Sequence, residues 1–110
     1  MREKTLGRTG LKVSELCLGT MTFGGQTAKD DAIEIIKTAF DRGVNFFDCA
    51  DIYCAGESER ILGEALSDIP RDDTVIATKV CGPIGRGMNG RGLSRKHIIS
   101  AVEGSLKRLG

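Results

Sequence analysis

Aromatic residues are scarce in this chain, whose 110 residues include four Phe, one Tyr and no Trp. Histidine is equally rare, with His97 alone, and none of the four cysteines forms a Cys-x-x-Cys pair. Protein metal sites usually need closely spaced Cys or His ligands, so the sequence predicts no bound metal. The scarcity of aromatics also raises the question of why the single phenol, Tyr53, stands in the segment FFDCADIYC, residues 46–54.

A long hydrophobic run is also absent. The longest uncharged stretch, residues 16–28, is interrupted by glycine, glutamine and threonine, so no membrane insertion is predicted. The first ten residues, MREKTLGRTG, lack the apolar core of a signal peptide. Without a secretory signal, a disulfide framework is not indicated. We therefore expect a cytoplasmic protein with four reduced thiols, those of Cys17, Cys49, Cys54 and Cys81.

An excess of either charge is missing as well, because 16 Lys and Arg stand against 15 Asp and Glu. This balance favours neither a nucleic acid nor a membrane surface as partner. The remaining composition, 40% hydrophobic and 28% charged, is typical of a soluble globular protein. The length predicts one domain, residues 1–110.

The order of apolar segments predicts a hairpin followed by three strand–helix units. Gly7 and Gly10 mark a turn inside residues 4–14. Short apolar runs typical of strands then alternate with segments whose apolar residues repeat at helical spacing. The strands are expected to end near Gly19, Asp48 and Lys79, about 30 residues apart, and this alternation predicts parallel strands.

Cap residues place the predicted helix ends. Thr27, Ser58 and Ser94 are the expected N-caps of the three helices, and Gly43 should end the first of them. The third strand, residues 74–78, is nearly continuous in apolar and β-branched residues, which predicts cover on both faces. From these residues two parallel architectures stay open, a doubly wound sheet and an eightfold barrel.

A formal G-x-G-x-x-G match occurs at Gly85, Gly87 and Gly90. The dinucleotide-binding fingerprint needs its first glycine directly after a strand and its last at the start of a helix. Here the run lies well beyond the third strand and ends before Ser94, so we interpret it as a flexible loop.

Polar side chains stand where the predicted parallel strands end, and ligands of such folds bind at these ends. Asp48 and Lys79 would face each other on adjacent strands, with Tyr53 reaching back from the following loop. An ammonium near a phenol favours the phenolate, which makes the phenol a competent general acid toward a carbonyl oxygen. A carbonyl reductase needs such an acid while a nicotinamide supplies hydride. A purely structural interpretation is equally consistent with the spacing. In it, Asp48 caps a loop, Tyr53 is a packing residue and Lys79 is solvated.

Four stretches carry a resemblance to a known family: LGRTGLKVSELCLGTMTFGG, RGVNFFDCADIYCAGESERILGEAL, VIATKV and GLSRKHIISAVEGSLKRLG. Over essentially its whole length the chain resembles the N-terminal part of the aldo-keto reductase family. The resemblance implies an α/β fold, the first part of a (β/α)8 TIM barrel, with an N-terminal hairpin at its bottom and about three βα units present. It also implies NADPH-dependent reduction of aldehydes or ketones to alcohols, with a small carbonyl substrate.

The resemblance also assigns roles to individual residues. Asp48, Tyr53 and Lys79 look like three members of the family's catalytic tetrad. Tyr53 would donate the proton, Lys79 would favour its ionisation, and Asp48 would hold Lys79. The implied NADPH contacts are Thr20, Met21, Gln26 and, near the nicotinamide ribose, Asp48.

The fourth tetrad member follows the fourth strand in the family, and Gly110 precedes that point. His97, which we expect to be exposed on the third helix, does not match it. We therefore expect the isolated chain to be an incomplete, inactive piece of the reductase that needs a complementing chain or a homo-oligomer. The segments GTMTFGGQ and GLSRKHII also resemble β-subunits of voltage-gated potassium channels, so a non-catalytic, cofactor-binding regulatory subunit is the alternative. A third alternative is an inert structural fragment.

Overall fold

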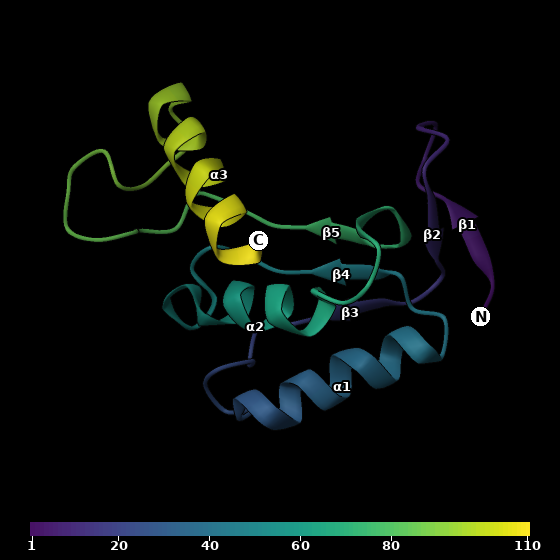
Figure 1. Ribbon diagram of the computed structural model, residues 1–110. Helices are drawn as coiled ribbons and strands as arrows, with labels where there is room; N and C mark the ends of the chain where they lie inside the picture. Colours follow the sequence, from purple (N-terminus) through teal and green to yellow (C-terminus); the bar gives the residue numbers. More distant parts are fainter.

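The computed structural model describes residues 1–110 and shows the hairpin and the three strand–helix units that the alternation predicts (Figure 1). The hairpin strands pair antiparallel, with Lys4 opposite Val13, and are β1 (Glu3–Thr5) and β2 (Lys12–Ser14). The parallel sheet follows in the order β3 (Cys17–Gly19), β4 (Phe46–Asp48) and β5 (Val75–Ala77).

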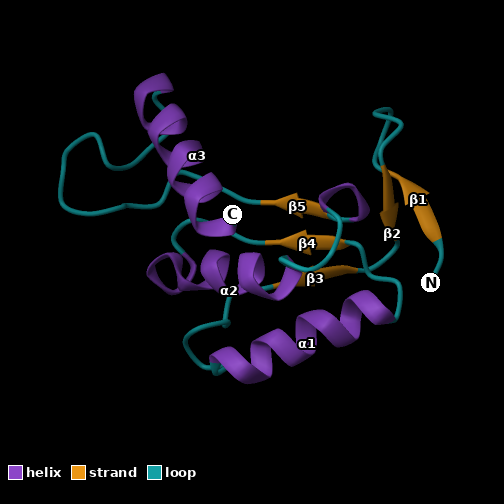
Figure 2. Ribbon diagram, viewed as in Figure 1, coloured by secondary structure: helices purple, strands orange, loops and turns teal.

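Helices lie mainly on one face of this sheet (Figure 2). They are α1 (Lys29–Asp41), α2 (Glu57–Leu66) and α3 (Arg95–Leu109), with two short 3-10 helices, η1 (Tyr53–Gly56) and η2 (Arg71–Asp73). Helix α2 packs between α1 and α3. None of the helices is both long and apolar enough to cross a membrane.

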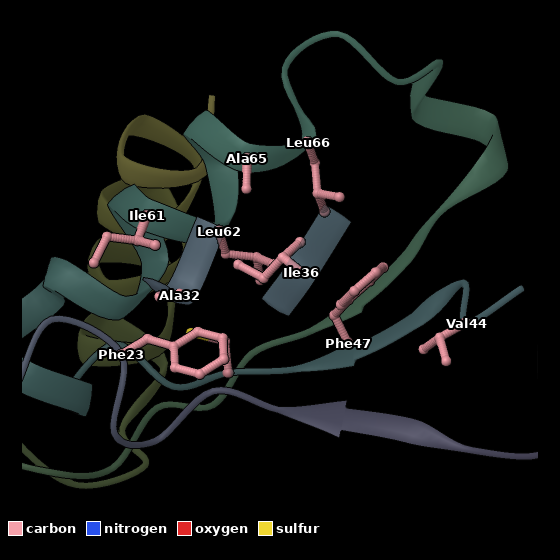
Figure 3. Close-up of a cluster of buried hydrophobic side chains, with 10 residues drawn as sticks. Phe23, Ala32, Ile36, Val44, Phe47, Ile61, Leu62, Ala65 and Leu66 are labelled. Atoms are coloured by element: carbon pink, nitrogen blue, oxygen red, sulfur yellow. The ribbon is translucent and has the colours of Figure 1, made fainter. Parts of the chain in front are cut away.

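Phe47 is the centre of the core, because strand alternation points it at the helices. It is fully buried and belongs to one cluster with Ile36 of α1 and Leu62 of α2 (Figure 3). Burying a phenylalanine side chain stabilises the fold by about 1.5–3 kcal/mol. The neighbouring Phe46 points to the opposite face and is only half-buried. All three residues of β5 are half-buried too, so the expected cover on both faces of that strand is wrong.

Two of the predicted helix ends are confirmed. Ser94 is the N-cap of α3, and its side chain accepts a hydrogen bond from the backbone N–H of His97 at 3.1 Å. Gly43 follows the C-cap of α1 with φ of 93°, a left-handed conformation that glycine adopts without a steric penalty.

The other two predicted N-caps are wrong, because both hydroxyls have partners elsewhere. Helix α1 starts after Ala28, and the Thr27 hydroxyl instead lies 2.9 Å from the hydroxyl of Thr22. Helix α2 starts after Gly56, so Ser58 falls inside its first turn and points into the protein.

The hairpin is tied to the sheet by the residue that precedes β4. The backbone N–H of Ser14 donates to Asn45 Oδ1 at 2.7 Å, and the Asn45 N–H donates to Ser14 Oγ at 3.2 Å. This anchors the hairpin at the end of the sheet where β3 begins (Figure 1).

The Gly-rich loop, residues 82–92 between β5 and α3, leaves the opposite end of the sheet (Figure 1). It closes on itself through the Ile84 N–H, which donates to the Gly90 carbonyl at 2.7 Å, and the Gly90 N–H, which donates to Gly87 at 3.0 Å. Helix α3 begins only at Arg95, so this run has the loop structure that was expected and does not open a helix.

Gly63 allows α2 and α3 to approach closely, and we expect Gly63→Ala to destabilise the chain. An added Cβ would clash with the Leu109 carbonyl oxygen, which is backbone and cannot swing away. Such overpacking costs about 1–3 kcal/mol. Urea unfolding followed by circular dichroism would measure the change.

Gly104→Ala is the matched control, because a Cβ there would lie 3.1 Å from the Arg108 guanidinium, which has to give way by only a few tenths of an ångström. The gain of about 0.5–1 kcal/mol from replacing a glycine inside a helix offsets this contact, so the stability of α3 should change little. Equal unfolding midpoints for the two variants would contradict the close approach of the helices.

Candidate active site

Backbone pairing between β4 and β5 continues past the ends of both strands. The Cys49 N–H donates to the Ala77 carbonyl at 2.8 Å, and the Asp51 N–H donates to the Lys79 carbonyl at 3.1 Å. The two segments therefore leave the sheet side by side. As a result Lys79 stands beside Asp48 at the carboxyl end of the sheet.

The Lys79 ammonium makes three hydrogen bonds. It donates to Asp48 Oδ2 at 2.8 Å, to the Cys49 carbonyl at 2.9 Å and to the Tyr53 hydroxyl oxygen at 3.0 Å. It also lies 4.8 Å from the centroid of the Tyr53 ring, within cation–π range. An ammonium has three hydrogens to donate, so these partners use all of them.

The environment keeps Lys79 charged. Partial burial lowers the pKa of Lys79, but the hydrogen bonds and charges of Asp48 and Tyr53 outweigh it, so the pKa is raised above its ordinary value. The side chains of Lys79 and Asp48 are 49% and 37% exposed. Water screens such a pair, so its contribution to stability is small and its partners stay accessible to a ligand.

A sharp turn places Tyr53. Its N–H donates to the Ala50 carbonyl at 3.2 Å, and η1 begins there. The next two residues, Cys54 and Ala55, have φ of 48° and 54°, and Gly56 follows with φ of 91°. Left-handed conformations cost L-residues about 1–2 kcal/mol each. The chain therefore accepts strain to turn from Tyr53 directly into α2.

The residues predicted to contact a cofactor separate into two groups. Thr20 is fully buried beneath Asp48, and its hydroxyl donates to the Asp48 carbonyl at 3.0 Å. Ser58 of α2 donates in turn to the Thr20 carbonyl at 2.7 Å. By contrast, Met21 and Gln26 are exposed on the loop between β3 and α1. No group of three or more His, Cys, Asp or Glu side chains is placed to hold a metal ion.

Glu59 supports the site from below, and the sequence analysis missed it. Its side chain is fully buried, accepts a hydrogen bond from the Thr78 hydroxyl at 2.7 Å and forms an ion pair with Arg108 of α3. Thr78 directly precedes Lys79. Glu59 stands three residues before the buried Leu62, so both side chains lie on the same face of the helix. This spacing indicates in the sequence that Glu59 faces inward.

His97 is buried, with 4% of its surface exposed, so the expectation of an exposed helix residue is wrong. It shares the inner face of α3 with Ala101 and Ser105, both buried. Spacings of four residues place these side chains on one helix face. The larger apolar residues Ile98, Val102 and Leu106 are exposed, so the apolar pattern of the sequence pointed away from the face that is buried.

Asp51 is the second buried titratable group that the sequence analysis did not single out. It is 1% exposed. Burial first, and the negative charge of Glu59 second, raise the pKa of the Asp51 carboxyl above its ordinary value. The charges of Arg108 and His97 offset part of this effect, as does the nearby Ile52 N–H, although its geometry does not make a hydrogen bond to the carboxyl.

Comparison with protein families matches residues 15–110 to the model described as the Aldo/keto reductase family. Among curated proteins, the chain is 46% identical over 112 aligned positions to the "Probable voltage-gated potassium channel subunit beta" of Oryza sativa subsp. japonica, and equally to the protein of that name in Arabidopsis thaliana. The alignments cover 99% of this chain and 34% of each relative. The chain thus spans about a third of the length of these relatives.

Solved structures show the same relation. The chain superposes on the aldo-keto reductase AKR11C1 from Bacillus halodurans, in its holo form, with a TM-score of 0.87 and 37% identity, covering 99% of this chain and 36% of that one. It superposes on the thermostable aldo-keto reductase Tm1743, in complex with epalrestat, with a TM-score of 0.82 and 34% identity, covering 99% and 39%. The predicted fold, the first part of the barrel, is confirmed.

Glu59→Gln should destabilise the chain by about 3–5 kcal/mol, because it leaves the Arg108 charge, 19% exposed, without its partner. Chemical unfolding would measure the loss. The matched control is Glu64→Gln, which breaks an ion pair of 2.7 Å with Lys29 on the surface, both side chains 54% exposed. Exposed pairs contribute about 0–1 kcal/mol. Similar losses in both variants would show that burial of Glu59 does not matter.

Asp51→Asn should raise stability at pH 7 and lose that advantage as the pH falls to about 4, the ordinary carboxyl range. Because the pKa of Asp51 is raised, ionisation favours the unfolded chain, so its cost is present at neutral pH and disappears in acid. Urea unfolding midpoints across this range would test it, with the exposed Asp72→Asn as control. A constant difference between wild type and variant at every pH would refute it.

Proposed function

Because the chain belongs to the aldo-keto reductase family, we propose that it carries the proton-donating part of a site that reduces aldehydes or ketones to alcohols with NADPH. The observation that carries the proposal is the hydrogen-bond arrangement around Tyr53. Since the Lys79 ammonium donates to the phenol oxygen, the phenol's own hydrogen is directed elsewhere. Tyr53 makes no other side-chain hydrogen bond, so this hydrogen is free for a carbonyl oxygen.

The neighbouring residues suit this proton transfer. When Tyr53 gives up its proton to the carbonyl oxygen, the Lys79 ammonium at 3.0 Å stabilises the phenolate that remains. Asp48 holds the ammonium in place at 2.8 Å and favours its charged form. The third hydrogen of the ammonium is donated to the Cys49 carbonyl, which fixes the orientation of the Lys79 side chain. Proton donor, charge partner and anchor are therefore preorganised before substrate arrives.

Bound NADPH would supply the hydride to the carbonyl carbon. The exposed Met21 and Gln26 and the partly exposed Asp48 lie at or near the carboxyl end of the sheet, where ligands of parallel folds bind. They fit a role in holding the cofactor. Thr20 would contribute from beneath, since its hydroxyl holds the Asp48 backbone.

The complete reaction needs more of the barrel than these residues. A closed barrel takes about 250 residues. The face of the sheet that carries Phe46 is not covered by helices here, and the edge of β5 has no further strand. We therefore propose that turnover requires further βα units, on the same or a complementing polypeptide, and that the 110-residue chain alone is inactive.

A regulatory, cofactor-binding subunit is the second candidate, favoured by the 46% identity to the plant potassium channel β-subunit relatives, against 37% and 34% to the solved reductases. The two candidates differ in how bound NADPH is used. A reductase oxidises many equivalents of NADPH in the presence of an aldehyde. A regulatory subunit would bind it with at most slow oxidation, and would bind a channel protein.

Tyr53→Phe should lower kcat/KM for aldehyde reduction by about 10²–10⁴-fold, the usual contribution of a general acid, while NADPH affinity stays unchanged. The assay follows NADPH absorbance with the purified chain alone and with the remaining two-thirds of the Bacillus halodurans relative supplied in trans. Lys79→Met should also impair turnover, because the phenolate loses its charge partner.

Lys37→Met is the control for charge removal, since Lys37 pairs with Asp68 at 3.4 Å on the surface of α1, away from the strand ends. Full turnover by the Tyr53→Phe variant would remove Tyr53 from the chemistry. Tight NADPH binding without turnover, in every form tested, would favour the regulatory candidate.

A further inference from the structure

Three buried polar atoms in this protein have no hydrogen-bond partner: Oδ1 and Oδ2 of Asp51 and Nε2 of His97. No other buried side-chain nitrogen or oxygen shares this property. Leaving such a group unsatisfied costs about 1–3 kcal/mol, so native proteins rarely do it without a reason. The proposed proton transfer uses neither residue.

The two side chains border the same space. A cavity of about 280 Å³ lies between α3 and the Gly-rich loop, and Asp51, His97, Asn89, Ser100 and Arg108 are among its lining residues. This volume is ample for an ordered water, which occupies about 30 Å³ in the liquid. The lining includes the polar side chains named above, so a water there has partners.

The charges around Asp51 leave it without a fixed partner. On α2 the nearest charge is Glu59, which is like-charged, and on α3 they are Arg108 and His97. Arg108 is already paired with Glu59. His97 has an unused ring nitrogen and borders the same space as Asp51, so one proton held between imidazole and carboxyl gives each of them a partner.

Asp51 also sits in the segment that presents the phenol. Its backbone N–H donates to the Lys79 carbonyl at 3.1 Å, and Tyr53 follows two residues later. On the far side of Tyr53 the backbone is strained at Cys54 and Ala55. A strained turn keeps its conformation only when its surroundings hold it. The Asp51 side chain is placed to tie this turn to α3.

We propose that Asp51 and His97 form a buried pair, joined through one water and sharing one proton, which positions Tyr53. The role in positioning a proton donor rests on the proposed function. The pair is not part of the chemistry, because its members touch neither the phenol oxygen nor the ammonium. It acts by anchoring the segment between β4 and η1 to α3.

The single Tyr and the absence of Trp make the intrinsic fluorescence of this chain a report on Tyr53 alone. We would measure its quenching by acrylamide in the unmodified 110-residue chain and in Asp51→Ala, His97→Ala and the double variant. Each single change should raise the quenching constant severalfold, because the turn loosens. The double variant should match the single ones, since both remove one interaction.

Three further variants separate positioning from general loosening. Asp51→Asn keeps a hydrogen-bonding group and should restore most of the protection of Tyr53. Leu66→Ala destabilises the core at the other end of α2, and Ser100→Ala alters the cavity wall only, so both should quench like wild type. Circular dichroism would show that every variant is folded under the conditions used.

Unchanged quenching in Asp51→Ala and His97→Ala, or additive effects in the double variant, would overturn the pair. Because the measurement needs neither substrate nor NADPH, its failure is distinct from failure of the reductase assay. Protection of Tyr53 that depends on the pair, in a chain without reductase activity under any condition, would reject the catalytic proposal and leave the anchoring of Tyr53 in place.

Discussion

Two backbone hydrogen bonds beyond the ends of β4 and β5 determine where the polar groups of this protein meet. They join Cys49 to Ala77 and Asp51 to Lys79, and they keep the two segments in register after the sheet ends. A shift by one residue would turn each side chain to the opposite face, because strand side chains alternate. The contacts of the Lys79 ammonium with Asp48 and with the phenol of Tyr53 both depend on that register.

Buried polar contacts hold this register from the helix side. Ser58 and Thr20 join α2 to the end of β3 and to the Asp48 backbone, and Glu59 joins α2 to Thr78. Arg108 extends the network to α3. Such groups stabilise a fold only as complete sets, because one missing partner leaves a buried charge or dipole unsatisfied. The helices therefore position the strand ends as well as covering the core.

The order of elements and the meeting of Asp48, Lys79 and Tyr53 were predictable from the sequence. Parallel strands of similar length end at one edge, so polar residues at corresponding ends come together. Helix ends were less predictable, since the hydroxyls of Thr27 and Ser58 found partners other than the nearest backbone amides. Which buried charges face one another depends on how each helix is rotated and spaced against its neighbours, and His97 was misplaced for that reason.

The sequence by itself determined the hairpin, the three strand–helix units, their parallel direction and the candidate trio, because these follow from periodicity and chain order. The tertiary structure alone decided that the Lys79 ammonium spends all three hydrogens on Asp48, Tyr53 and a backbone carbonyl, leaving the phenol's proton free. It also decided that Asp51 and His97 are buried without partners. Distances between side chains on different elements arise from packing, which no local pattern of residues encodes.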